Sequence, residues 1–173
     1  MSRVPVWSPS MRTRGPWIDV HAHPGRCFLA GLAHDHALAQ ILGGDGSAAA
    51  LGAARAAGLT AVSFATVADL AVLAPTPEGG LHAGRPFRPV EASDDHRRQL
   101  DGIQKVVELA GLDIARTAGD LERAHEEGTT AVLITCEGGD FLEGGIDGLL
   151  EARTAGMSSL TLVHYRVNEI GDI

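Results

Sequence analysis

Two histidines separated by one residue follow a short apolar run near the start of the chain. The segment Trp17–Pro24 reads Trp-Ile-Asp-Val-His-Ala-His-Pro. Residues two apart on an extended strand share a face, so Asp19, His21 and His23 are predicted to lie on one side of a strand. Imidazoles at this spacing can converge on one divalent cation, and zinc and its neighbours bind imidazole well. Taken alone, the motif also fits a buried strand whose histidines form ordinary hydrogen bonds.

A carboxylate follows a second apolar run further along the chain. Glu137 comes directly after the predicted strand 129–136, and Gly138 and Gly139 follow it. Two glycines let the backbone turn sharply, and a carboxylate at such a turn can bridge two metal ions about 3.5 to 4 Å apart. An ordinary turn is the alternative for Glu137 alone. Its combination with the histidine pair favours a metal centre.

Composition places the chain among globular proteins. It has 173 residues, of which 45% are hydrophobic, and a formal net charge of -8. That charge, without a dense basic cluster, predicts no nucleic-acid partner. No apolar run approaches the roughly 18 to 20 residues that span a bilayer, so we expect no membrane span. The two cysteines, Cys27 and Cys136, are too few for a disulfide scaffold and indicate a reducing, cytoplasmic setting.

The remaining sequence alternates predicted strands and helices. Residues 1–16 are expected to form a loose extension, and 17–173 to form part of one domain. Strands are predicted at 17–24, 59–67, 112–116, 129–136 and 158–164, and helices at 33–41, 47–57, 93–110, 119–127 and 145–154. The proline-rich segment 75–89 is predicted to be a long loop. This order is typical of βα units that wind a parallel sheet, either open or closed into a barrel.

The positions of the polar residues favour the barrel. His21 and His23, Glu137, and His164 each lie at the carboxyl end of a different predicted strand. The carboxyl ends of parallel strands meet at one edge, where the ligands of a barrel enzyme bind. The glycine fingerprint of a dinucleotide site, G-x-G-x-x-G, follows none of the strands.

Together these motifs resemble a known family. Asp19-x-His21-x-His23 is similar to the first-strand signature of the amidohydrolase superfamily. Glu137-Gly138-Gly139-Asp140, followed by Leu160–His164 and then Asn168, resembles the membrane (renal) dipeptidase family, peptidase family M19.

The resemblance implies a (β/α)8 barrel that hydrolyses the peptide bond of dipeptides with a binuclear zinc centre. It implies that His21 and His23 are metal ligands, that Glu137 bridges both ions, and that His164 contacts the substrate carbonyl. Asn168 is then a candidate substrate-binding residue. The two divalent ions, zinc or alternatively manganese, would lower the pKa of a bridging water towards 7 and generate hydroxide. A hydrogen bond from His164 to the developing oxyanion is commonly worth about 3 to 4 kcal/mol.

The sequence departs from the family in two ways. The second ligand of the family is an aspartate, whereas this chain has His23, and a neutral ligand leaves the site more positive. A barrel of eight units needs about 250 residues, so this chain resembles about the first five βα units. In the family, two further histidine ligands and a proton-handling aspartate lie in the second half. We therefore expect little peptidase activity from the isolated chain, and association with itself or with a missing C-terminal half.

Three alternative functions remain open from the sequence. One is a different amidohydrolase-like or histidinol-phosphatase-type metal hydrolase, which also uses a first-strand His-x-His. The second is a noncatalytic barrel fragment that acts as a binding or assembly module. The third is a small open α/β domain that binds a ligand through the 75–89 loop.

Other polar residues are predicted to have ordinary roles. Arg85 and Arg88 are interpreted as solvated loop charges, although a substrate carboxylate could bind them. Cys136 is predicted to be a small buried residue. Surface positions are predicted for the remaining histidines, which are His34, His36, His82, His96 and His125.

Overall fold

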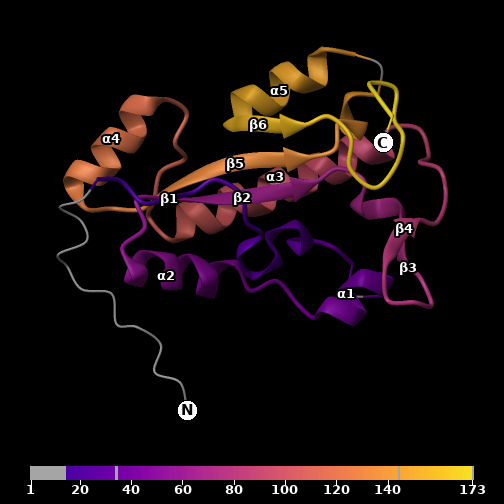
Figure 1. The fold of residues 1–173 in the computed structure, drawn as a ribbon, viewed down its shortest axis with the longest axis horizontal. Helices are drawn as coiled ribbons and strands as arrows, with labels where there is room; N and C mark the ends of the chain where they lie inside the picture. The colour runs from indigo at the N-terminus through magenta and orange to yellow at the C-terminus, as the bar shows by residue number, and fades with distance from the viewer. Residues whose placement is uncertain (1–14, 34, 144, 173) are drawn as a thin grey trace.

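A curved parallel sheet forms the centre of the molecule (Figure 1). The structure is a computed structural model that describes residues 15–33, 35–143 and 145–172. Within these residues the main sheet has four strands in the order β1-β2-β5-β6, and every neighbouring pair is parallel. The strands are β1 (Ile18–Asp19), β2 (Ala61–Val67), β5 (Ala131–Glu137) and β6 (Met157–Thr161). Because they are parallel, all four point their carboxyl ends at one edge.

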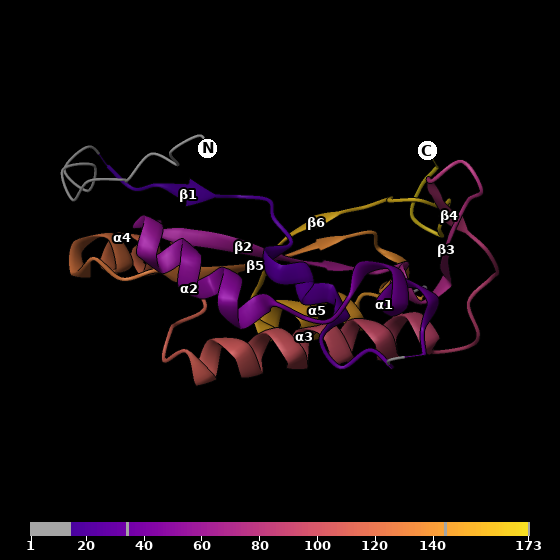
Figure 2. The same ribbon diagram turned by 90° about the horizontal axis from the view of Figure 1, so that it is seen from below.

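The helices that connect these strands gather on one face of the sheet. They are α2 (Ser47–Ala57), α3 (Glu91–Leu109), α4 (Ala118–Glu127) and α5 (Asp147–Ala155), with a short α1 (Ala37–Leu42). In the view from below, α2, α3 and α5 all lie on the same side of the strands (Figure 2). An open doubly wound sheet carries helices on both faces, whereas a barrel carries them only outside. The arrangement is that of a partial (β/α)8 barrel, as the sequence predicted.

The helix-facing side of the sheet forms the main core. Val62 and Phe64 of β2 and Ile134 of β5 are at most 4% exposed, and they belong to one cluster with Leu51 of α2 and Ile103 of α3. All seven residues of β2 are buried, as expected of a strand with neighbours on both edges. This packing fixes β2 and β5 rigidly, and the candidate site lies at their carboxyl ends.

The regular elements follow the predicted ones closely, with differences at the ends. Helix α2 has the predicted bounds and ends at Gly58, which adopts the left-handed conformation that glycine favours. Helix α4 begins with a capping box in which Thr117 and Asp120 bind each other's backbone amides. Helix α3 begins at Glu91, two residues before the predicted start. The predicted helix at 33–41 begins only at Ala37.

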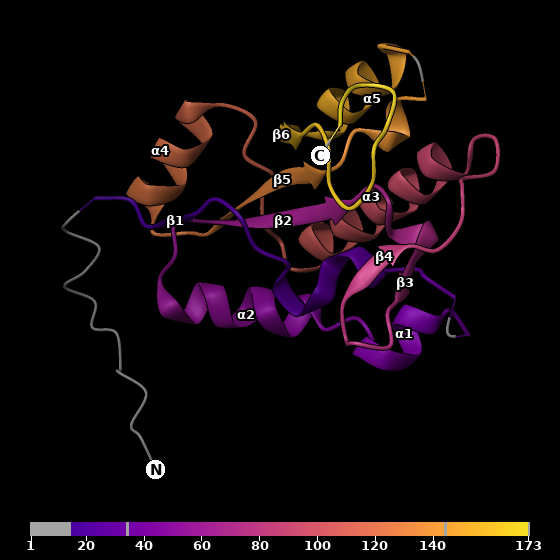
Figure 3. The same ribbon diagram turned by 45° about the vertical axis from the view of Figure 1, so that its right-hand side comes forward.

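Three predictions about strands need correction. The first strand contains only Ile18 and Asp19, because Val20 leaves the sheet and is 70% exposed. The predicted strand at 112–116 is reduced to an isolated bridge between Ile114 and Val132. The predicted loop at 75–89 begins inside an antiparallel hairpin, in which strand β3 (Leu73–Pro75) pairs with strand β4 (Leu81–Ala83). Figure 3 shows this hairpin and the segment after β6 beyond the carboxyl ends of β2 and β5.

Short 3-10 helices follow several of the strands at this edge of the sheet. They are η2 (Pro24–Leu29), η3 (Leu70–Val72) and η4 (Asp140–Leu142). Each turns the chain away from the strand end, and η2 and η4 do so soon after the polar residues that the sequence singled out. Within the described residues, no helix is both long enough and apolar enough to cross a bilayer.

The prediction of a surface position is wrong for His96. This residue of α3 is 2% exposed, and its ring stacks on Phe141 with the centroids 3.9 Å apart. Its Nε2 atom has no hydrogen-bond partner, and burial lowers the pKa of His96 from 6.5 to about 4. His82 is exposed as predicted, and His125 is half-buried. His36 caps α1 by accepting the amide of Leu38, while His34 lies outside the described residues.

The low pKa of His96 makes a prediction for acid stability. The unfolded chain binds a proton at this residue below about pH 6.5, whereas the folded chain does so only near pH 4. Stability should therefore fall as the pH drops through this window, by about 2 to 3 kcal/mol at this one site. Urea unfolding at pH values above and within the window should show a smaller loss for His96→Phe than for the wild type. The exposed His82→Asn should behave like the wild type, and equal losses in all three proteins would contradict the assignment.

Candidate metal centre

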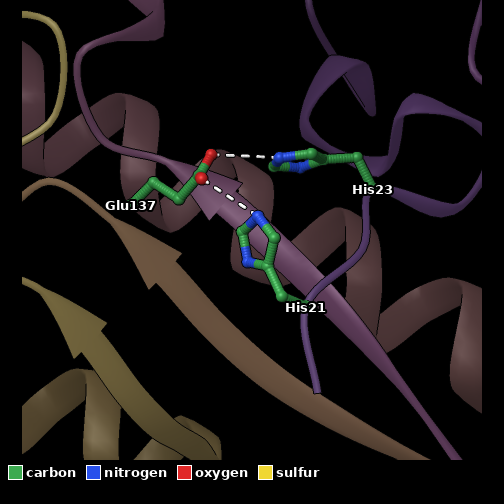
Figure 4. Close-up of side chains that lie close together, drawn as sticks. All are labelled: His21, His23 and Glu137. Carbon is green, nitrogen blue, oxygen red and sulfur yellow. Dashed lines mark ion pairs between the residues drawn. The ribbon is translucent and has the colours of Figure 1, made fainter. Parts of the chain in front are cut away.

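Two imidazoles and one carboxylate meet at the carboxyl edge of the sheet. The Nε2 atom of His21 lies 3.1 Å from Oε1 of Glu137, and the Nε2 atom of His23 lies 3.0 Å from Oε2 (Figure 4). One ligand atom from each residue lies within 4.8 Å of the other two. The side chain of Glu137 is 18% exposed and that of His21 56%, so the group is open to solvent on the His21 side. The three residues that the sequence singled out therefore share one place.

Hydrogen bonds to β2 hold the histidine segment although β1 has already ended. The carbonyl of Ala22 accepts the amide of Ala65 at 3.0 Å, so the segment continues alongside β2. The carboxylate of Asp19 accepts the amide of His21 at 3.2 Å. Pro24 then begins η2 and turns the chain away. Asp19 thus shapes the backbone of the motif.

The ring of His23 is fixed by a hydrogen bond at its other nitrogen. Its Nδ1 atom lies 3.1 Å from the carbonyl oxygen of Ala65, and a carbonyl can only accept, so Nδ1 carries the proton. In the neutral ring, Nε2 then presents its lone pair to the Oε2 atom of Glu137 at 3.0 Å. Two acceptors at this distance need a proton or a cation between them. A histidine whose Nδ1–H binds a backbone carbonyl is the usual form of a metal ligand.

Backbone hydrogen bonds on both sides fix Glu137 at the end of β5. Its carbonyl accepts the amide of Ala68 at 2.8 Å, after β2. On the other side, the amides of Gly138 and Gly139 donate to Thr161 at 2.9 Å and Leu162 at 3.0 Å. The turn therefore joins β2, β5 and the segment that follows β6.

Glycine is required at both positions of this turn. Gly138 has a φ of +90°, and a Cβ atom there would lie 2.9 Å from the carboxylate of Asp140. A Cβ atom at Gly139 would lie 2.4 Å from Ile170 and 3.1 Å from the carbonyl of Leu162. Atoms of neighbouring residues lie so close to these two positions that a side chain would crowd them, which explains the two glycines that follow Glu137.

The electrostatic surroundings keep Glu137 ionised. When His23 is protonated at both ring nitrogens, its hydrogen bond lowers the pKa of Glu137 below its ordinary value, and the imidazoles of His164 and His21 add to this effect. Partial burial acts in the opposite direction without cancelling it. An ionised carboxylate beside two imidazoles is a donor set that zinc binds.

His164 lies at the edge of the same group. It follows β6 by three residues, and its Nε2 atom is 3.5 Å from Oε2 of Glu137. Its Nδ1 atom lies 2.8 Å from the carboxylate of Asp69. Burial alone would lower the pKa of His164, but the hydrogen bond and charge of Asp69, together with the charge of Glu137, raise it above its ordinary value.

Asp69 is the residue of this site that the sequence analysis missed. It lies two residues after β2 and is completely buried. The signal was available, because a polar residue just past a buried parallel strand is the same pattern that drew attention to Glu137.

Asn168 and Arg85 are engaged in other contacts. The side chain of Asn168 donates to the carbonyl of Leu162 at 2.7 Å and accepts the amide of Ile170 at 2.9 Å, so it closes the segment after β6. Arg85 forms a bidentate ion pair with Glu91, in which its two terminal nitrogens donate to the two carboxylate oxygens at 2.7 and 2.8 Å. That pair lowers the pKa of Glu91 to about 2 and ties Arg85 to the start of α3.

Cys136 and Cys27 are buried and free, as predicted for Cys136, and burial raises the pKa of each thiol to about 12.

Comparison with protein families identifies the relatives of this chain. Residues 53–173 match the membrane dipeptidase family, peptidase family M19. The chain belongs to this family. The predicted resemblance is confirmed, and the matched residues include Glu137, His164 and Asn168. His21 and His23 precede the match, so their part in the site rests on the geometry described above.

Solved structures confirm the fold of this M19 chain. An M19 metallopeptidase described as dipeptidase AC matches with a TM-score of 0.59 and 20% identity, over 86% of this chain. A metallopeptidase from Rhodobacter sphaeroides, liganded with a phosphinate mimic of the dipeptide L-Ala-D-Ala, matches with a TM-score of 0.54 and 20% identity over 86%. An amidohydrolase from Pseudomonas aeruginosa matches with a TM-score of 0.55 and 13% identity over 94%.

The M19 chain is much shorter than these structures. It spans 42% of dipeptidase AC, 45% of the Rhodobacter enzyme and 38% of the amidohydrolase. A search of curated proteins finds no match. The fold is therefore that of part of a larger barrel.

The shared position of His21, His23 and Glu137 makes a prediction for metal binding. Removing either the His23 imidazole or the Glu137 charge takes away one of three donors, so His23→Ala and Glu137→Gln should each weaken zinc binding by about 100-fold or more. Isothermal titration calorimetry of the 173-residue chain measures this. The exposed His82→Ala is the matched control and should bind as the wild type does. Equal zinc affinity in all four proteins would contradict the site.

The glycine turn makes a second prediction. Gly138→Ala should destabilise the chain by about 1 to 3 kcal/mol, because alanine is strained at positive φ and its Cβ would crowd Asp140. Gly52→Ala in α2, where a Cβ has no neighbour within 4 Å, should instead stabilise the chain by about 0.5 to 1 kcal/mol. Urea unfolding measures both. A Gly138→Ala chain as stable as the wild type would show that the turn is more adaptable than its geometry indicates.

Proposed function

We propose that this chain carries the first half of the active site of a metal-dependent dipeptidase, which hydrolyses the peptide bond of dipeptides. The observation that carries the proposal is that His21 and His23 each lie within 3.1 Å of the carboxylate of Glu137 in a chain of the M19 family. The activity itself is a proposal because the chain spans less than half of its solved relatives.

Each residue of the site has a distinct proposed role. His21, His23 and Glu137 would hold the divalent ions, zinc or alternatively manganese, and Glu137 would be a ligand to both. When bound, these ions supply the nucleophile, because they lower the pKa of a water towards neutrality. His23 stands where the family has an aspartate. Its neutral ring leaves the site more positive, which favours this acidification.

His164 is proposed to bind the carbonyl oxygen of the substrate. Its Nε2 atom faces the carboxylate of Glu137 at 3.5 Å, so a carbonyl held beside the metal centre would be within reach. The raised pKa of His164 favours the doubly protonated ring, which can donate at Nε2. Donation to a developing oxyanion is worth about 3 to 4 kcal/mol at comparable sites. Asn168 lies on the same segment after β6. We propose that it binds the substrate, either directly or by holding this segment in place.

Binding of a dipeptide mimic tests the proposed substrate without requiring a complete catalytic cycle. The Rhodobacter relative was solved with a phosphinate mimic of L-Ala-D-Ala. We expect this mimic to bind the 173-residue chain only in the presence of zinc, and Glu137→Gln to abolish that binding. Calorimetry with and without zinc provides the measurement.

Two results would count against a dipeptidase. Absence of zinc-dependent mimic binding would favour the noncatalytic fragment, particularly if zinc binding is also unaffected by His21→Ala. Hydrolysis of phosphate monoesters by the zinc- or manganese-loaded chain would favour the phosphatase alternative. The structure gives no specific support to either reading.

We further propose that the chain associates through the open side of its sheet. The outer edge of β6 has no strand partner among the described residues. Beyond it, Leu162, Val167 and Ile170 are 54%, 52% and 42% exposed. Exposed strand edges and apolar side chains favour association, either with a second copy or with the remainder of a barrel.

Sedimentation velocity tests this association. We expect the 173-residue chain to form dimers or larger species as its concentration rises. Replacing Leu162 with Lys on the exposed segment should shift the distribution towards the monomer, whereas a matched change at the exposed Leu109 of α3 should not. A monomer at every concentration would overturn the proposal.

We propose a cytoplasmic location, which the two free cysteines fit.

A further inference from the structure

A buried carboxylate stands behind His164. Asp69 is 0% exposed and accepts two hydrogen bonds, from Nδ1 of His164 at 2.8 Å and from the amide of Tyr165 at 2.9 Å. It comes from the segment after β2, whereas both of its donors come from the segment after β6. The pair joins residues 95 positions apart in the sequence.

We propose that Asp69 is a positioning residue that keeps the proton of His164 on Nδ1 and aims Nε2 at the metal-centre carboxylate. This inference rests on the proposed function, since it concerns the residue that would bind the substrate carbonyl. An orienting carboxylate behind a working imidazole fixes both the ring and its tautomer.

The geometry leaves one arrangement of protons at this pair. The amide of Tyr165 can only donate, so it takes one oxygen of Asp69, at 2.9 Å. The other oxygen faces Nδ1 of His164 and, as part of a carboxylate, can only accept. Nδ1 must therefore donate, and Nε2 is left to face Glu137.

Burial argues for a specific role. A fully buried carboxylate costs free energy unless its hydrogen bonds compensate for the loss of water. If Asp69 served only to anchor the chain after β6, the amide of Tyr165 would need no more than a neutral acceptor. The second oxygen, directed at Nδ1 of His164, requires the side chain to act on the ring.

The substitution Asp69→Asn separates positioning from anchoring. The asparagine oxygen must still accept the amide of Tyr165, which cannot accept in return. Its NH2 group then faces Nδ1 of His164, and the ring must accept there and move its proton to Nε2. The variant thus keeps the anchor and the shape while it removes the proton from Nδ1.

Nitrogen-15 NMR of the histidine side chains in the 173-residue chain measures this directly. At a single neutral pH, the wild type should show His164 Nδ1 as a protonated nitrogen, assigned by the signal that His164→Gln removes. In Asp69→Asn this nitrogen should shift to the unprotonated range. The matched control is Asp140→Asn, which changes another buried carboxylate nearby, one that pairs with Arg166, and should leave the proton on Nδ1 of His164 in place.

Each outcome decides the proposal. An unprotonated Nδ1 in the wild type would overturn it even if Asp69→Asn failed to fold. A protonated Nδ1 that persists in a folded Asp69→Asn would also overturn it.

Ligand binding then separates this proposal from the proposed function. Asp69→Asn should weaken zinc-dependent binding of the phosphinate mimic by about tenfold while leaving zinc affinity unchanged, because a neutral ring with one proton replaces the doubly protonated ring that the charge of Asp69 favours. Unchanged mimic binding, or an equal loss of zinc affinity, would show that Asp69 has only a structural role. If the wild type binds no mimic, the proposed function fails, and the NMR result still decides whether Asp69 sets the tautomer.

Discussion

Strand β2 fixes the positions of the histidine motif and of Glu137 relative to each other. On one edge, Ala65 donates its amide to Ala22 and accepts Nδ1 of His23, so a single residue fixes both the backbone and the ring of the histidine motif. On the other edge, the amide of Ala68 binds the carbonyl of Glu137. Because β2 is buried along its whole length, these contacts rest on the most rigid part of the core. The distance between the imidazoles and the carboxylate is therefore set by the sheet.

This arrangement brings together groups that repel one another unless a positive charge lies among them. Nδ1 of His23 donates its proton to the carbonyl oxygen of Ala65. In the neutral ring, the lone pair of Nε2 therefore faces the carboxylate of Glu137 at 3.0 Å. A divalent cation removes that conflict for both residues at once, whereas protonation would resolve it one imidazole at a time. Hydrogen bonds that lie outside the site thus arrange these side chains as a group that could hold a metal ion.

The sequence predicted the fold class, most helices and the three residues that converge, since these follow from alternating elements and strand ends. It did not predict where the motif strand ends, because valine favours a strand, whereas Val20 leaves the sheet and is 70% exposed. His96 was misassigned for a related reason. It was placed on a polar face of its helix, but η4 brings Phe141 over that face. Asp69 was missed because a single aspartate near a strand end has no motif, and its partner lies 95 residues away.

We infer that His21, His23 and Glu137 bind a common cation. Crystals of the 173-residue chain grown with zinc, with anomalous diffraction recorded at the zinc absorption edge, test it most directly. We predict an anomalous peak between the Nε2 atoms of His21 and His23 and the carboxylate of Glu137. A well-ordered structure with these three side chains in place and no peak among them would contradict it.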